Sequence, residues 1–251
     1  MIAPENLEAK ISELLSDFYK RRIEKISGLK LKDTLKRKNP YLYRAVGIQK
    51  ASQIVEEILI AYMSSSDEGI FGDAFFEPLA KFASGGVVSP SPGVDVAIET
   101  DSKYTAIAVK SGTSVFNSQS KAKQILEFQH LQRRLQKLQK QFDPIIGFSY
   151  GNKQQRIQST AFYRELAGQA FWAEITGDED FYLKIIQLMK NKPSEHLPEY
   201  RMAFDSALNR FTKEFIDDFC FENGIINWEK LVKFNSGRPE VKAPTKKIKK
   251  T

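Results

Sequence analysis

The chain has 251 residues, and its 41% hydrophobic fraction suffices for the core of one large domain, with or without an appendage. Its 38 lysines and arginines exceed its 31 acidic residues, and this net charge of +7 permits an anionic partner without naming one. No run of eighteen apolar residues occurs and Met1–Lys20 lacks an apolar signal core, so we expect a cytoplasmic protein without a membrane helix. One cysteine, Cys220, and two histidines argue against a disulfide or a structural zinc site.

Apolar residues at three- and four-residue spacing predict three helices in the first third of the chain, at Pro4–Ile26, Ile48–Met63 and Ile70–Phe82. A short basic amphipathic piece, Leu29–Lys38, follows the first of them. Three serines after Met63 predict the end of the second. The third contains Pro78, which removes a helical donor and clashes one turn back, so this helix either begins near Glu77 or kinks there.

Two alternating runs, Val94–Glu99 and Tyr104–Lys110, surround a polar Thr-Asp-Ser-Lys turn. Alternation with period two around such a turn predicts a β-hairpin. In the simplest register Asp95 lies opposite Ala108, and Lys110 lies on the same face, one diagonal step from Asp95. The sequence therefore predicts a carboxylate and an amine close together on one face of a hairpin whose other face is apolar.

The second half of the chain predicts one strand among several helices and a final turn. The strand is Pro144–Tyr150; the helices are Ser118–Phe142, Tyr163–Ile175, Phe181–Met189 and Glu199–Phe221, and the turn is Asn227–Val232. This order predicts an α/β fold in which a small mixed sheet has helices on both faces. We expect a single domain over residues 1–240 and a basic, disordered tail at 241–251.

The pattern Asp95 … Ala108-Val109-Lys110 resembles the core of PD-(D/E)XK nucleases, and of type II restriction endonucleases in particular. Segments in the same order also resemble that family, namely Lys36–Ala45 (KRKNPYLYRA), Phe71–Glu77 (FGDAFFE), Lys110–Gln119 (KSGTSVFNSQ) and Gly168–Asp178 (GQAFWAEITGD). The resemblance implies a restriction-endonuclease-like core, a Mg²⁺ cofactor, a double-stranded DNA substrate and a homodimer. In that family an aspartate on one strand and an acid-x-lysine on the next bind the metal, which activates water.

The chain departs from the family pattern because Ala108 stands where the second acid is expected, and alanine cannot bind metal. The family commonly completes the site with a helical glutamate, and Glu77 precedes the hairpin in the matching segment. Asp73 lies one turn before Glu77. Glu99 lies about 13 Å from Asp95 along an extended strand, too far to share a metal. A further possibility is that no acid substitutes and cleavage is impaired.

We therefore predict Asp95 and Glu77 as metal ligands and Lys110 as a catalytic residue near the attacking water, with Asp73 and Glu99 as weaker candidates. Each has a plainer interpretation. A glutamate at a helix start is favoured by the helix dipole. Asp95 can be a polar residue at a strand edge and Lys110 an ordinary surface lysine.

Basic stretches at Lys20–Arg44 and Lys121–Arg156 suit a nucleic-acid partner, since lysine and arginine contact phosphates and arginine and glutamine read base edges. Our DNA-binding candidates are Lys36, Arg37, Lys38, Ser111, Asn117, Gln119, Lys121, Arg133, Arg134 and Lys137. Asn117 can equally cap the helix that follows it. For any single basic residue, a solvated surface is the plainer interpretation.

The sequence hypothesis is a metal-dependent, site-specific double-stranded DNA endonuclease of the type II restriction class. The alternatives are a catalytically impaired DNA-binding protein on the same fold, and a repair or structure-specific nuclease. No GxxxxGK[ST] motif occurs, which argues against nucleotide hydrolysis, and no GxSxG motif marks a serine nucleophile.

Overall fold

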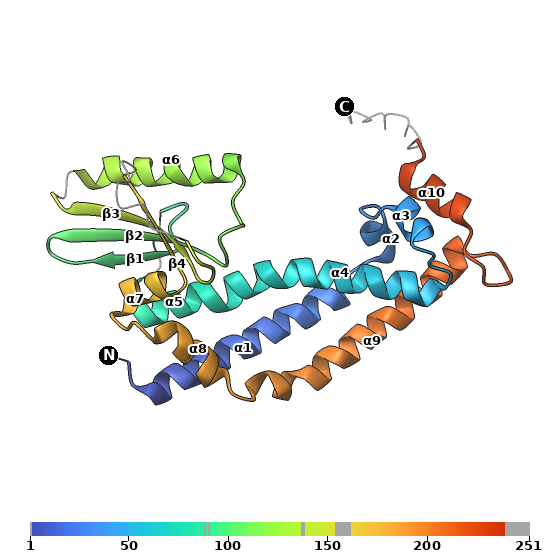
Figure 1. Cartoon of the computed structure of the whole chain (residues 1–251), viewed down its shortest axis with the longest axis horizontal. Helices are drawn as coiled ribbons and strands as arrows, with labels where there is room; N and C mark the ends of the chain where they lie inside the picture. The colour runs from blue at the N-terminus through green and yellow to red at the C-terminus, as the bar shows by residue number, and fades with distance from the viewer. Residues whose placement is uncertain (1, 88, 90, 137–138, 154–161, 239–251) are drawn as a thin grey trace, which may run out of the picture. The chain divides into compact units, whose positions relative to one another are not determined.

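The computed structural model describes residues 2–87, 89, 91–136, 139–153 and 162–238. Its strands are β1 (Val96–Glu99), β2 (Lys103–Lys110), β3 (Gln141–Phe148) and β4 (Arg164–Ala167). Its helices are α1 (Pro4–Ser27), α2 (Leu31–Leu35), α3 (Pro40–Ala45), α4 (Ala51–Phe71), the π-helical η1 (Gly72–Phe76), α5 (Glu77–Ser84), α6 (Ser118–Leu135), α7 (Gln169–Thr176), α8 (Phe181–Met189), α9 (Lys192–Phe219) and α10 (Trp228–Ser236) (Figure 1). Within the described residues, every helix is too short or too polar to cross a lipid bilayer.

The chain divides into two compact units. Residues 1–26 and 63–203 form one, which contains all four strands and which we call the sheet unit. Residues 27–62 and 204–251 form the other, the helical unit. The expectation of a single domain over residues 1–240 stays a prediction, and the basic tail at 241–251 lies outside the described residues.

The sheet has the strand order β1-β2-β3-β4. β1 and β2 pair antiparallel, whereas β3 runs parallel to both β2 and β4. Val96 pairs with Ile107, and the backbone N–H of Asp95 donates to the carbonyl of Ile107 at 2.9 Å. This is the register predicted for the hairpin, and the mixed sheet confirms the predicted α/β class.

Helices cover both faces of the sheet, as the sequence predicts (Figure 1). On one face α6 supplies Phe128 and Leu131 to a buried cluster with Ala106, Ala108 and Ile146. On the other face η1, α5 and α7 pack against the strands. The buried residues of that second cluster include Phe75, Leu79, Val96, Ile107, Val109, Ile145, Phe171 and Trp172.

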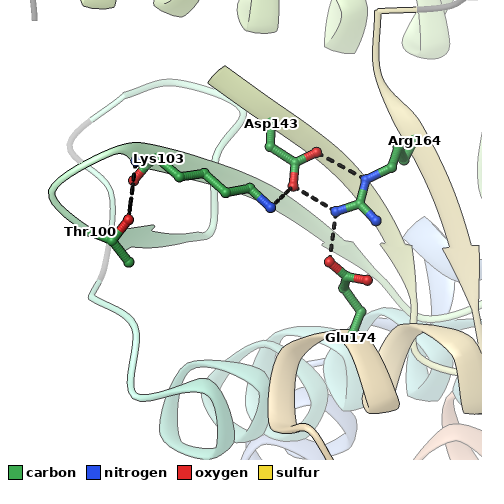
Figure 2. A network of polar contacts seen from close by, with 5 residues as sticks. All are labelled: Thr100, Lys103, Asp143, Arg164 and Glu174. Atoms are coloured by element: carbon green, nitrogen blue, oxygen red, sulfur yellow. Dashed lines mark hydrogen bonds and ion pairs between the residues drawn. The ribbon is translucent and has the colours of Figure 1, made fainter. Parts of the chain in front are cut away.

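A network of polar contacts joins β2, β3, β4 and α7 near the amino ends of the parallel strands (Figure 2). Asp143 is its centre, and its side chain is only 12% exposed. Lys103 approaches one of its oxygens at 2.6 Å, and Arg164 donates to both oxygens at 2.9 and 2.6 Å. Arg164 also donates to Glu174 at 2.7 Å, so a single guanidinium links a strand carboxylate to a helix.

The predicted helix at Tyr163–Ile175 is wrong in its first half, because residues 164–167 form β4. Leu166 and Ala167 are buried in the clusters on opposite faces of the sheet, so this short strand shows no polar face. Gly168 then turns the chain into α7 with a φ of 53°, which favours glycine.

Several helix ends also differ from prediction. The three serines do not end α4, which continues to Phe71 because no glycine cap or proline interrupts it before the π-helix. The helix predicted for Ser118–Phe142 ends at Leu135, and β3 begins at Gln141. The helix predicted to begin at Glu199 is α9, which begins earlier, at Lys192. The helix at Phe181–Met189 is confirmed.

Candidate active site

The carboxyl ends of the three parallel strands lie at one edge of the sheet. Lys110, the last residue of β2, pairs with Phe148, which in turn pairs with Ala167. Open α/β sheets bind their ligands at this edge, because the loops that leave the strands gather there. The predicted catalytic residues Asp95 and Lys110 both lie at this edge.

Asp95 is fixed by the strand beside it. Its Oδ2 accepts a hydrogen bond of 2.7 Å from the backbone N–H of Val109. The Lys110 Nζ lies 3.4 Å from the same carboxylate oxygen and donates to the Val109 carbonyl at 2.9 Å. Both side chains keep about a quarter of their surface exposed, 25% for Asp95 and 27% for Lys110. The ammonium is therefore held beside the carboxylate but stays open to a ligand.

Glu77 is the first residue of α5 and lies within electrostatic reach of this pair. Burial, followed by the negative charge of Asp95, raises the pKa of Glu77 from 4.5 to about 7. Lys110 acts in the opposite direction, and Asp73 adds a smaller upward contribution. The structure thus places Asp95, Lys110 and Asp73 within electrostatic reach of Glu77, and Asp95 and Lys110 in contact with each other.

The π-helical segment η1 directly precedes Glu77. Such segments change the phase of a helix and are frequent at functional sites. A Cβ on Gly72 would lie 2.5 Å from the Ser111 Oγ, so only glycine fits here without a shift. The Ser111 hydroxyl donates to the carbonyl of Glu68 at 3.2 Å. The loop after Lys110 is therefore packed closely against α4 and η1, which lead directly into the helix that carries Glu77.

Glu99 does not join this group. It lies at the turn end of the hairpin, where its carboxylate pairs with the Lys140 Nζ at 2.7 Å. Its side chain is 49% exposed. The structure therefore gives Glu99 an ion pair of its own, away from Asp95.

A divalent cation fits the donors at this edge only if solvent or substrate completes its coordination. No group of three or more histidine, cysteine or acidic side chains suited to a metal occurs in the part of the chain that the structure describes. Asp95 and Glu77 supply two carboxylates, and burial, followed by the negative charge of Asp95, raises the pKa of Glu77. Mg²⁺ is commonly held by one or two carboxylates together with waters and phosphate oxygens, so this pair fits it.

The comparisons with known proteins agree with this geometry. The family model described as "Type II restriction endonuclease EcoO109I" matches residues 5–196, which is more than half of the chain. The chain belongs to this family of restriction endonucleases. The comparison with curated proteins gave no match. Membership supports a restriction-type nuclease, a hydrolase that acts on DNA, in a family that generally uses divalent metal ions.

The DNA-binding candidates of this restriction endonuclease fall in different places. Asn117 caps α6 in a capping box with Ser120, which confirms its structural interpretation. Ser111 is buried against α4, whereas Gln119 and Arg133 are exposed. Arg134 donates to the Ser91 hydroxyl at 2.9 Å. Lys36, Arg37 and Lys38 belong to the helical unit, and Lys137 lies outside the described residues.

Lys121 has a partner that the sequence analysis missed. Its Nζ lies 2.5 Å from the carboxylate of Glu165, and Lys153 pairs with the same carboxylate. The hydrogen bond to Glu165 raises the pKa of Lys121, so the lysine stays charged. No local motif marks this cluster, because it joins α6, β4 and the loop after β3, and β4 itself was predicted as a helix.

Proposed function

We propose that the protein is a Mg²⁺-dependent type II restriction endonuclease that hydrolyses phosphodiester bonds of double-stranded DNA at specific sites. The observation that carries this proposal is the Asp95–Val109–Lys110 geometry, a carboxylate fixed by a backbone N–H with an ammonium beside it. It lies at the carboxyl edge of the sheet in a chain that belongs to a restriction endonuclease family.

Asp95 and Glu77 are the proposed metal ligands, and Glu77 replaces the acid that is missing at Ala108. Ala108 is fully buried in the apolar cluster beneath α6, where a carboxylate would lose its hydration. Glu77 instead comes from a helix on the other face of the sheet and keeps part of its surface exposed. When bound, the cation neutralises phosphate charge and promotes ionisation of a water molecule.

Lys110 is the proposed partner of the scissile phosphate and the attacking water. Its two hydrogen bonds hold the ammonium between the Asp95 carboxylate and the Val109 carbonyl. A cation held in advance stabilises negative charge that develops at phosphorus, without reorganisation during the reaction. Gln119, Lys121 and Arg133, all on α6, are proposed to contact the DNA, and the phosphate contacts among these would set the position of the duplex.

Cleavage of long, sequence-complex duplex DNA tests this proposal. Wild type with Mg²⁺ should yield discrete fragments, and EDTA should abolish them. Asp95→Asn, Glu77→Gln and Lys110→Ala should each reduce the rate by about 100-fold or more, since changing even an outer-shell partner of a metal commonly costs 10–100-fold. Glu99→Gln is the matched control, because it removes an equally charged residue from the same hairpin and should cleave normally.

The other outcomes point to the alternatives. Intact DNA that still shifts in a salt-sensitive binding assay would support the impaired, binding-only protein, for which Ala108 offers the reason. A featureless smear that disappears in all three variants would support a repair or non-specific nuclease. If Asp73→Asn abolishes cleavage and Glu77→Gln cleaves at the wild-type rate, the second metal ligand is Asp73 rather than Glu77.

A further inference from the structure

The net positive charge of the protein belongs to one of its two units. The helical unit contains 17 lysines and arginines and 10 acidic residues, whereas the sheet unit contains 21 of each. These counts account for all 38 basic and 31 acidic residues of the chain, so the whole net charge of +7 belongs to the helical unit. Without residues 239–251 that unit still has 12 basic against 9 acidic residues. Long-range attraction of a polyanion therefore acts on the helical unit, while the candidate active site lies in a neutral one.

A basic turn in the helical unit lines a shallow cavity of about 410 Å³ between α2 and α3 and the end of α10. The lining residues are Lys36, Arg37, Lys38, Asn39, Pro40, Tyr41, Asn235 and Ser236. The Asn235 side chain donates to the carbonyls of Leu35 and Lys38 at 3.0 and 2.9 Å. Leu35 is the last residue of α2 and Lys38 is the last residue of the basic turn, so Asn235 of α10 is bonded to the chain on both sides of Lys36 and Arg37.

The charges of this turn are largely uncompensated inside the unit. Lys36 pairs with Asp33 at 3.6 Å, but both side chains are at least 60% exposed and such pairs contribute little. Arg37 and Lys38 have no acidic partner among the residues that the structure describes. Tyr41, 61% exposed, adds a hydroxyl beside them. A fixed loop with three cations and a hydroxyl suits phosphate oxygens, which accept several charge-assisted hydrogen bonds.

We propose that the helical unit is a second DNA-docking module and that the basic turn Lys36–Lys38, braced by Asn235, binds the sugar–phosphate backbone of duplex DNA. Asn235 and Ser236 lie beyond residue 196, where the family match ends, so the complete cavity is not a property of the matched segment. This inference deepens the proposed function, on which its choice of duplex DNA rests. It assigns sequence-independent affinity to one unit and hydrolysis to the other.

Binding of a 30-base-pair duplex of random sequence in EDTA tests the inference, with fluorescence anisotropy over a series of salt concentrations. The variant Lys36→Gln/Arg37→Gln/Lys38→Gln should bind about tenfold or more weakly, and its plot of log K against log [salt] should be shallower by about two to three units, since each phosphate contact contributes about 0.9. The charge-retaining variant Lys36→Arg/Arg37→Lys/Lys38→Arg should bind like wild type. Equal thermal melting curves would show that both variants fold.

The matched control is Lys50→Gln/Lys213→Gln/Lys230→Gln, which removes three exposed charges from the same unit outside the cavity. It should change the salt slope by less than one unit. An equal loss of affinity in the two neutralised variants would overturn the inference, because DNA binding would then depend on the net charge of the unit and not on the basic turn. An unchanged slope in the Lys36–Lys38 variant would overturn it as well.

Failure of this inference and failure of the proposed function give different results. Wild type that binds the duplex through the basic turn but never cuts it supports the docking site and removes the catalytic assignment. The opposite result is Mg²⁺-dependent cutting that Asp95→Asn abolishes, with a salt dependence of binding that neutralisation of Lys36–Lys38 does not change. That result would support the proposed function and contradict the docking site.

Discussion

Glu77 is the proposed second metal ligand, and its negative charge is unfavourable in the folded protein without metal. Burial and the neighbouring Asp95 raise its pKa to about 7, above the 4.5 expected in the unfolded chain. A carboxyl whose pKa is raised on folding takes up a proton, so its contribution to stability falls as the pH rises from about 4.5 through 7. The acid proposed to bind the cation is therefore also a source of instability when the cation is absent.

Glu77→Gln should stabilise the metal-free protein at pH 8 by about 1 kcal/mol, once solvent screening of a half-exposed group is allowed for. The gain should vanish below about pH 5, where the wild-type carboxyl is protonated in both states. Thermal melts in EDTA at both pH values measure this. Mg²⁺ should raise the Tm of wild type but not of Glu77→Gln. Equal Tm values for the two proteins at pH 8 in EDTA would contradict the proposed environment of Glu77.

The sequence sufficed to place Asp95 and Lys110, because their relation depends only on the register of a four-residue turn. It favoured Glu77 over Asp73, Glu99 and the absence of any replacement acid, but it could not establish that Glu77 lies near Asp95, because that proximity joins an irregular helix to a strand. Period-3.6 patterns cannot reveal a π-helical turn, which shifts the helix phase by about one residue. The residues whose partners lie on another element, such as Glu165 and Asp143, were not predicted for the same reason.

At the scale of elements, the packing of β3 against α7 depends on the absence of one side chain. A Cβ on Gly147 would lie 2.1 Å from a ring carbon of Phe171, which is fully buried. Gly147→Ala should therefore destabilise the fold by about 1–3 kcal/mol through overpacking. Gly69→Ala in α4 is the control, since its Cβ meets nothing within 4 Å, and it should stabilise by about 0.5–1 kcal/mol. Urea denaturation measures both, and opposite signs are the expected result.

The polar network of Figure 2 ties three strands and α7 together in a pH-dependent way. Burial alone would raise the pKa of Asp143, but hydrogen bonds from Arg164 and Lys103 outweigh it and hold the pKa below its usual 3.8. Hydrogen bonding to Arg164 also lowers the pKa of Glu174. Depressed carboxyl pKa values give stability that is complete above the unfolded pKa and is lost as the pH falls through the folded values.

Asp143→Asn should accordingly destabilise the protein at pH 7, by about 2 kcal/mol, because it leaves Arg164 and Lys103 facing an uncharged amide. The difference from wild type should begin to narrow below about pH 4, where the Asp143 carboxyl of the unfolded chain takes up a proton, and should narrow further as the pH falls through the lower folded pKa. Chemical denaturation at pH 7 and pH 3 checks the sign. Asp101→Asn, an exposed change in the neighbouring hairpin turn, should be nearly neutral at both. If Asp143→Asn lowers the free energy of unfolding by the same amount at both pH values, the shape of the side chain rather than its charge matters at this position.

At the scale of the whole molecule, the helix-sheet-helix order predicted the fold class but not the division into two units. Each unit is built from two segments far apart in sequence, with α4 and α9 contributing to both. Composition along the chain shows basic stretches, yet only this three-dimensional grouping shows that one unit is neutral and the other carries all the net charge. Discontinuous units of this kind leave no linker for sequence analysis to detect.

One chain provides one group of Asp95, Glu77 and Lys110, whereas a double-strand break needs one hydrolysis in each strand of the duplex. We therefore expect a two-fold symmetric homodimer, in which each protomer cuts one strand. Mixing wild type with an excess of Asp95→Asn protein before adding supercoiled plasmid tests this. Heterodimers should nick, so open circles should accumulate in place of linear DNA, in proportion to the mutant fraction. Linear product that falls only with the amount of active protein, without open circles, would show that a single protomer cuts both strands.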